Sequence, residues 1–221
     1  MHRPAACLFD LDGLLLDTEP LHARAWQEAA SAFGRPLAAD ELMALRGRRR
    51  HDCADQVRRW IADSGGPQLS REELLAVRQP IAEALLPTAA PMPGAAEFVQ
   101  RCIELAVPMA LATSSSKEAV ALKAAPHPWL EPIRVRVHGD DPELTAGKPA
   151  PDVFLLAAAR LGVATSDCWA FEDSPAGACS ALAAGCTVHV LPPSHLDEHA
   201  IASLYPGIER FVSSLAEIEL G

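Results

Sequence analysis

Residues 9–19 read FDLDGLLLDTE and complete a short apolar run, residues 5–9. The run has the length and composition of a buried strand, because it is apolar throughout and ends at polar residues. Asp10 and Asp12 follow it immediately. In open parallel sheets, ligands bind beyond the carboxyl ends of the strands, so acidic residues at this point predict a site as well as a fold.

Four more apolar runs of strand length lie in the second half of the chain, and helical patterns separate them. The strands are predicted at residues 109–112, 134–138, 168–171 and 187–191, and the helices at residues 118–125, 152–161 and 175–184. Such alternation is typical of an α/β fold, in which helices cover both faces of a mostly parallel sheet. The sequence therefore predicts a Rossmann-like core, with a short edge strand at residues 211–212.

The segment between the first two predicted strands carries helical patterns and no strand. Helices are predicted at residues 20–33 and 70–85, and the second begins with Ser70 and Glu73, the spacing of a reciprocal helix cap. We therefore expect an inserted α-helical domain. The predicted domains are a catalytic core of residues 1–16 and 88–221 and a helical insert of residues 17–87.

Composition argues against several classes of protein. Of the 221 residues, 49% are hydrophobic and 22% are charged, which is ordinary for a globular protein large enough to bury a core. The formal net charge of -10 argues against binding to nucleic acid or to an anionic membrane. The six cysteines form no C-x-x-C pair, so neither a zinc site nor a disulfide framework is predicted. No stretch resembles a signal peptide or a membrane span, and we expect a cytoplasmic protein.

Three predicted strands are followed by polar residues that a parallel sheet would bring to one edge. They are Asp10 and Asp12 after the first strand, Thr113 and Ser114 after the second, and Glu172 and Asp173 after the fourth. Each group alone has an ordinary explanation, such as a solvated turn, a helix cap or surface charge. Together, four carboxylates would repel one another unless a cation joined them. Mg²⁺ prefers few, hard oxygen ligands, so the sequence predicts a magnesium site.

A bound phosphate group would explain the remaining polar residues. Its oxygens can be held by the hydroxyl of Thr113 or Ser114 and by the ammonium of Lys148, which lies in the stretch GKPAPD. Asp10 can then attack phosphorus, while Asp12 protonates the leaving oxygen and later deprotonates water. We therefore expect a phosphatase that acts on a small phosphorylated metabolite through a covalent aspartyl-phosphate at Asp10.

These residues closely resemble the four motifs of the haloacid dehalogenase superfamily, in order and across nearly the whole chain. Residues 10–19 match the pattern D-x-D-G-x-[hydrophobic]-x-D-[ST]-E, and the later motifs are matched by Thr113 or Ser114, by Lys148, and by Glu172 and Asp173. The resemblance implies the HAD fold, and it implies hydrolase chemistry at the matched residues.

The resemblance also assigns roles. It implies that Asp10 is the nucleophile and Asp12 the general acid and base. It implies a magnesium ion that is held by the Asp10 carboxylate, the Asp12 backbone carbonyl and the Asp173 carboxylate. Glu172 would be either a further ligand or a partner of the ligands. Residues 17–87 would be a helical cap of the first type, whose closure excludes water from the reaction. Enzymes with this cap are often monomeric, so we expect a monomer.

Three longer stretches are similar to the branch that contains pseudouridine-5'-phosphatase, glycerol-3-phosphate phosphatase and 2-deoxyglucose-6-phosphatase types: residues 9–19, residues 87–94, and residues 139–143 ahead of 147–149. They carry scaffold rather than substrate contacts, so the substrate stays open among sugar, polyol and nucleoside monophosphates. A beta-phosphoglucomutase-like mutase is an alternative, because it shares Asp10, Asp12, the cap and Lys148. If the chain were a non-catalytic binding protein, we would expect some of the catalytic residues to be replaced. A dehalogenase would need neither Asp12 nor a metal.

Substrate choice is expected to come from the helical insert, whose most unusual stretch is RGRRRHD at residues 46–52. Charge runs are usually solvated, so one interpretation is an exposed loop or helix start. The other is that Gly47 allows a tight loop and that Arg50 reaches a polar or anionic group of the substrate. His22 lies four residues after Thr18 and is predicted either to face the site and bind substrate or to be a buried structural histidine.

Overall fold

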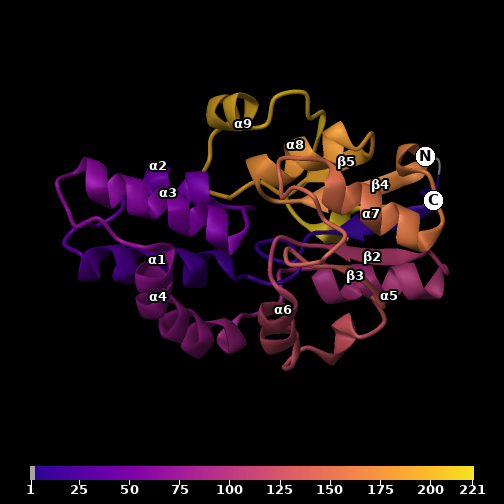
Figure 1. Ribbon diagram of the computed structural model, residues 1–221. Helices are drawn as coiled ribbons and strands as arrows, with labels where there is room; N and C mark the ends of the chain where they lie inside the picture. Colours follow the sequence, from indigo (N-terminus) through magenta and orange to yellow (C-terminus); the bar gives the residue numbers. More distant parts are fainter. Residues whose placement is uncertain (1–2) are drawn as a thin grey trace.

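The computed structural model describes residues 3–221, so residues 1 and 2 of the predicted core segment 1–16 lie outside it. Its centre is a six-stranded sheet with the order β3-β2-β1-β4-β5-β6, in which all neighbouring strands are parallel (Figure 1). The strands are β1 (Ala6–Phe9), β2 (Met109–Ala112), β3 (Val135–Val137), β4 (Cys168–Glu172), β5 (Thr187–Val190) and β6 (Arg210–Phe211). The predicted α/β fold is confirmed, with β1 in the interior of the sheet.

Helices cover both faces of the sheet, and each face has its own apolar core. The helices of this part are α5 (Ala95–Glu104), α6 (Lys117–Ala124), α7 (Asp152–Leu161), α8 (Pro175–Ala183) and α9 (Glu198–Leu204). Phe98 of α5 packs with Phe9 on one face, where their ring centroids are 5.8 Å apart. Phe154 of α7 packs with Leu8 on the other face. Successive strand residues point to opposite faces, so neighbouring residues of β1 serve the two cores.

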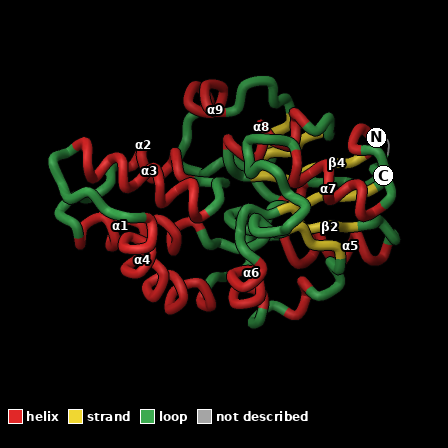
Figure 2. The backbone as a smooth tube through the Cα atoms, viewed as in Figure 1, coloured by secondary structure: helices red, strands yellow, loops and turns green. Residues whose placement is uncertain are grey.

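Four helices form the insert after β1, on the left of Figure 1 and in red, apart from the yellow strands, in Figure 2. They are α1 (Glu19–Ala32), α2 (Ala39–Leu45), α3 (Arg50–Asp63) and α4 (Arg71–Leu85). They have a core of their own, in which Trp26, Val57 and Leu74 are buried. The predicted reciprocal cap of α4 is confirmed: the Glu73 N–H donates to the Ser70 hydroxyl, and the Ser70 N–H donates to the Glu73 carboxylate.

The predicted bounds of β1 to β5 and of the five predicted helices differ from the observed bounds by at most one residue. The edge strand β6 lies one residue earlier than predicted. Bounds for α2, α3, α5 and α9 were not predicted. α2 is only 7 residues long, and α3 begins inside the basic run, where charge rather than apolar periodicity dominates the sequence. Among residues 3–221, none of the helices combines the length and the apolar character that a bilayer-spanning segment requires.

Candidate active site

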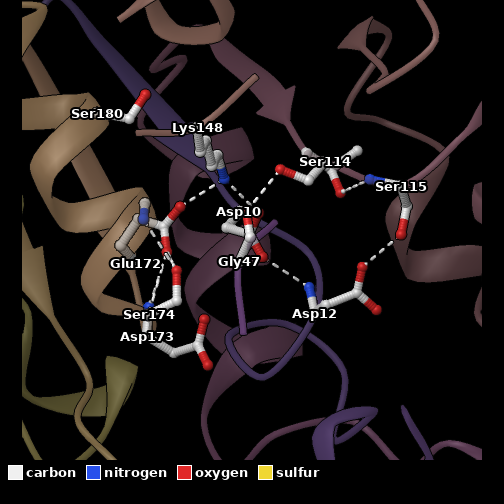
Figure 3. Close-up of polar contacts among 12 residues, drawn as sticks. Asp10, Asp12, Gly47, Ser114, Ser115, Lys148, Glu172, Asp173, Ser174 and Ser180 are labelled. Carbon is white, nitrogen blue, oxygen red and sulfur yellow. Dashed lines mark hydrogen bonds and ion pairs between the residues drawn. The ribbon is translucent and has the colours of Figure 1, made fainter. Parts of the chain in front are cut away.

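The candidate site lies at the carboxyl edge of the sheet, where the ends of β1, β2 and β4 meet (Figure 3). Asp10 follows β1, Thr113 follows β2, and Glu172 is the last residue of β4. Parallel pairing aligns these ends, because Phe9 of β1 pairs with Phe171 of β4. The sheet therefore brings together polar residues that are far apart in the chain, as the sequence predicts.

Lys148 enters the site from the loop before α7 and joins two of the carboxylates. Its ammonium donates to Asp10 Oδ1 and to Glu172 Oε1, at 2.5 Å each. The side chain is 0% exposed, and a buried ammonium is costly unless it is paired. Burial alone would lower the pKa of Lys148, but the two carboxylates raise it above its ordinary value. Lys148 therefore carries its charge throughout the neutral pH range.

Asp10, Glu172 and Asp173 form one acidic group, in which each residue offers an oxygen within 4.8 Å of the others. Burial raises the pKa of Asp10 to about 7 although Lys148 opposes it, and raises the pKa of Asp173 to about 6 although Arg46 opposes it. Such shifts mean that the cost of burying these carboxylates exceeds what the nearby cations offset. Buried, hard oxygen ligands with excess negative charge fit a magnesium ion.

The Asp12 carboxylate turns away from this acidic group. Its backbone N–H donates to Asp10 Oδ2 at 2.8 Å, but its own oxygens accept from Lys123 at 2.5 and 2.6 Å, from Ser115 at 2.7 Å and from Thr18 at 2.6 Å. Burial alone would raise the pKa of Asp12, but Lys123 holds it well below its ordinary value. The expectation that four carboxylates crowd together is therefore wrong: three do, and Asp12 is paired separately.

The two hydroxyl candidates after β2 have different contacts. Thr113 is fully buried, and its hydroxyl accepts the N–H of Ser115 at 3.1 Å. The Ser114 hydroxyl donates to the carbonyl of Gly47, at 2.7 Å, and Ser114 lines the pocket between insert and core. Ser114 thus ties the sheet edge to the insert, as the dashed line in Figure 3 shows. A phosphate-binding role for either hydroxyl stays a prediction.

The basic run reaches the acidic group instead of pointing to solvent. The Arg46 guanidinium donates to Asp173 and lies 3.3 Å from Glu19. Its side chain is 15% exposed, so the interpretation of the run as a solvated loop is wrong for this residue. Gly47 has a φ of 72°, and a Cβ at this position would lie 2.1 Å from the Ser174 hydroxyl oxygen. The prediction that Gly47 allows a tight loop is confirmed.

His22 faces the pocket between insert and core, which Asp10 and Asp12 also line. The His22 Nε2 atom lies 3.2 Å from Asp12 Oδ1, and Arg78 donates to His22 Nδ1 at 2.8 Å. Because an arginine can only donate, Nδ1 accepts, and Nε2 carries the hydrogen that is donated to Asp12. The structure thus favours the interpretation in which His22 faces the site. Both ring nitrogens are already bonded, so its contact is with Asp12.

Arg50 and Arg78 lie on the insert side of the pocket and are among its arginines without a carboxylate partner within residues 3–221. Arg50 donates to Gln79 at 3.0 Å, and the buried Arg78 lies over the Trp26 ring, 4.7 Å from its centroid. The Nε atoms of both arginines have no hydrogen-bond partner in this part of the chain. Burial lowers the pKa of Arg78 to about 10. The insert therefore brings positive charge to the pocket, while contact of Arg50 with a substrate stays a prediction.

Sequence reasoning missed Arg78, Lys123 and the contact of Arg46, a residue of the basic run, with Asp173. For two of them a signal exists in helical spacing. Arg78 is buried together with Leu74 and Ala82, four residues away on either side in α4. Lys123 is buried together with Val120, three residues earlier in α6. A basic residue in register with apolar ones lies on the inward face of a helix and needs a polar partner there.

Comparisons with known proteins agree with this geometry. A model of the family described as haloacid dehalogenase-like hydrolase matches residues 4–185. The chain is 37% identical over 205 residues to a probable pseudouridine-5'-phosphatase of Drosophila melanogaster, covering 90% of this chain and 86% of that protein. It is 34% identical over 195 residues to (DL)-glycerol-3-phosphatase 2 of Arabidopsis thaliana, and the match covers 86% of this chain and 80% of that protein. The crystal structure of a CbbY variant from Rhodobacter sphaeroides with xylulose-1,5-bisphosphate has a TM-score of 0.78 at 27% identity, covering 97% of this chain and 96% of that chain.

Proposed function

The chain belongs to the haloacid dehalogenase-like hydrolase family and is a phosphoric monoester hydrolase, and from this premise we propose that it releases phosphate from a small metabolite with the help of Mg²⁺. The observation that carries the proposal is the buried Asp10 carboxylate, held by Lys148 at 2.5 Å beside Glu172 and Asp173. A second carboxylate, Asp12, stands two residues away in its own polar environment. Two carboxylates in different environments suit two different chemical roles.

Asp10 is the proposed nucleophile. Lys148 fixes one carboxylate oxygen and offsets its charge, which lowers the repulsion between Asp10 and an approaching phosphate anion. Attack by a carboxylate oxygen forms a bond to phosphorus as the ester P–O bond breaks, and Asp12, which is ionised beside Lys123 in the free protein, passes to the leaving oxygen a proton that it takes up when the substrate binds. Lys148 and the hydroxyl of Thr113 or Ser114 are proposed to hold the phosphate oxygens that do not react.

Water completes the reaction in the second half. Asp12 takes a proton from the attacking water, the bond between Asp10 and phosphorus breaks, and inorganic phosphate leaves with the Asp10 carboxylate restored. Mg²⁺, for which Asp10, Glu172 and Asp173 are the proposed side-chain ligands, would neutralise charge on the phosphate. Helices α1 to α4 are proposed to act as a cap that excludes bulk water while these steps proceed.

The proposed substrates are sugar, polyol or nucleoside monophosphates. Two relatives are named as a probable pseudouridine-5'-phosphatase and a glycerol-3-phosphatase. Each name describes a substrate that is phosphorylated and rich in hydroxyl groups. The insert side of the pocket supports this class, because it combines the apolar Trp26 and Leu45 with the polar Arg50 and Gln79. Apolar surface with a few placed polar groups is typical of small-molecule sites.

Phosphate release from a panel of monoesters tests the proposal. The purified protein is assayed with nucleoside, sugar, polyol and 2-carbon acid phosphates, in Mg²⁺ and in EDTA. We expect release from one of the first three classes and its loss in EDTA, because three buried carboxylates need a cation to accept a phosphate anion. Release that is insensitive to EDTA would contradict the role of the metal. No release, with interconversion of hexose phosphates once a bisphosphate is added, would assign a mutase instead.

Replacing Arg50 with glutamine is expected to weaken substrate binding and to change the rate of the chemical step much less. Arg50 lines the pocket and has an unpaired Nε, so it can donate to a polar or anionic group of the substrate. A lost charged hydrogen bond predicts a rise in KM of about 10-fold, with kcat changed by less than about 3-fold. Steady-state kinetics on the best substrate of the panel measures both.

The matched control for Arg50→Gln is Arg59→Gln. Arg59 lies on the same helix, α3, but is exposed and bonds to Gln56. We expect its substitution to leave KM and kcat unchanged. Equal KM values for the wild-type protein and Arg50→Gln would show that Arg50 makes no contact with the substrate.

A further inference from the structure

Lys123 is a buried lysine that the proposed chemistry does not yet use. It lies near the end of α6, on the face that also carries Val120, and its side chain is 0% exposed. Burying an ammonium costs free energy unless a charged partner and further hydrogen bonds compensate for the lost water. A chain of this composition could place an apolar residue at this core-facing position, so the choice of lysine needs a reason.

The partners of Lys123 are all parts of the Asp12 environment. Its ammonium lies 2.5 Å from Asp12 Oδ1 and 2.6 Å from Asp12 Oδ2, and it donates to the Ser115 hydroxyl at 2.7 Å. The Ser115 hydroxyl in turn donates to Asp12 Oδ2, a contact drawn in Figure 3. Thr18 and His22 also bond to Asp12 Oδ1, as Ser115 does to Oδ2, but of these partners Lys123 alone contacts both oxygens and carries a charge, so it restrains the rotation of the carboxylate about its last side-chain bond most strongly.

Lys123 itself has no access to a substrate. Ser115 lines the pocket, as does Asp12, whereas Lys123 is fully buried beneath them. Any effect of Lys123 on the reaction must therefore pass through the two pocket residues it bonds to, Asp12 and Ser115. A contribution to stability alone is a weak explanation, because buried ion pairs are often no more stable than well-packed apolar residues of similar volume.

We propose that Lys123 is a positioning residue that sets the orientation of the Asp12 carboxylate toward the leaving oxygen of the substrate. This inference rests on the proposed function, in which Asp12 is the general acid. Proton donation in a transition state needs the acid within hydrogen-bond reach of the leaving oxygen, so a carboxylate that is held less firmly gives up part of that contribution.

The proposal has a consequence that depends on the leaving group. An alkoxide is a strong base and must be protonated as it leaves, whereas p-nitrophenolate is a weak base and leaves without a proton. The ratio kcat/KM reports the steps up to formation of the phosphorylated Asp10, before water enters. Loss of Lys123 should therefore lower kcat/KM for alkyl phosphates and leave kcat/KM for p-nitrophenyl phosphate nearly unchanged.

The test compares Lys123→Met with the wild-type protein on both kinds of ester. General acid catalysis contributes about 100-fold to 10,000-fold, so partial misplacement predicts a loss in kcat/KM of about 30-fold on alkyl phosphates and less than about 3-fold on p-nitrophenyl phosphate. Asp12→Ala should show the same selectivity. In the Asp12→Ala background, Lys123→Met should cost less than about 2-fold more, because residues that act through one another are not additive.

Lys117→Met is the matched control, since Lys117 is an exposed lysine of the same helix. It should leave both activities unchanged. If Lys123→Met does not fold, as judged by thermal unfolding, Lys123→Gln replaces it, and its neutral amide NH2 group, which can still donate to Asp12, predicts a smaller loss with the same selectivity for alkyl esters.

Two results would overturn the proposal. An equal loss on alkyl and aryl esters would mean that Lys123 acts on the fold or on the whole site, and a gain in kcat/KM would mean that it holds Asp12 out of use. Both are distinct from failure of the proposed function, in which the wild-type protein releases no phosphate from any ester in Mg²⁺.

Discussion

Replacing Asp10 with asparagine is expected to abolish phosphate release, with a fall in kcat of about 10,000-fold or more. The amide keeps the shape of the side chain but has no carboxylate oxygen to attack phosphorus, and removal of a covalent nucleophile typically has effects of this size. The protein should remain folded. Burial already raises the pKa of Asp10 to about 7, so a neutral side chain suits this position, and Lys148 keeps its contact with Glu172.

The measurement for Asp10→Asn is phosphate release under single-turnover conditions, with enough enzyme to detect slow reaction. Asp63→Asn serves as the control, because Asp63 is exposed at the end of α3. It should retain full activity. A thermal unfolding midpoint within a few degrees of the wild-type value would show that the loss is chemical. Substantial turnover by the variant would rule out Asp10 as the nucleophile and with it the proposed covalent mechanism.

The centre of the sheet was predictable because β1, β2 and β4 are compact, largely apolar runs followed by polar residues. β1 is the clearest case: Ala6–Phe9 is buried at every position and ends at Asp10. Parallel order then follows from the helices between successive strands, and it brings the ends of β1, β2 and β4 together. The insert was predictable only as a helical region, because its packing around Trp26 depends on contacts between helices rather than on a local pattern.

The residues of the candidate site that the sheet positions could be predicted from the sequence. Those whose positions depend on side-chain rotamers or on contacts between the insert and the core could not. Asp10 and Glu172 are placed by the strands they follow or end, and Lys148 reaches both. The direction of the Asp12 side chain could not be read from its sequence position, because its partners include Lys123 and Ser115, which are more than 100 residues away in the chain. The contact of Arg46 with Asp173 depends on how the insert sits against the sheet.

Replacing Lys148 with methionine is expected to cause the largest loss of stability of any single change in the site. Lys148 is the buried cation for Asp10 and Glu172, and removing one partner of a buried ion pair typically costs about 3 to 5 kcal/mol in the free energy of unfolding. We also expect kcat to fall by about 100-fold to 1,000-fold, because the phosphate loses a preorganised positive charge. Saturating Mg²⁺ should restore part of the stability by binding the folded protein.

The loss of stability in Lys148→Met should depend on pH in a defined direction. Without the lysine, the pKa values of Asp10 and Glu172 in the folded protein rise further above their unfolded values, so the folded state binds more protons than the unfolded state. Stability then falls as pH rises, and the deficit relative to the wild-type protein should be larger at pH 8 than at pH 5.5. Urea unfolding at both pH values, in EDTA and in Mg²⁺, measures it, with Lys117→Met as the exposed control. A deficit that is independent of pH and of Mg²⁺ would mean that Lys148 contributes packing rather than charge.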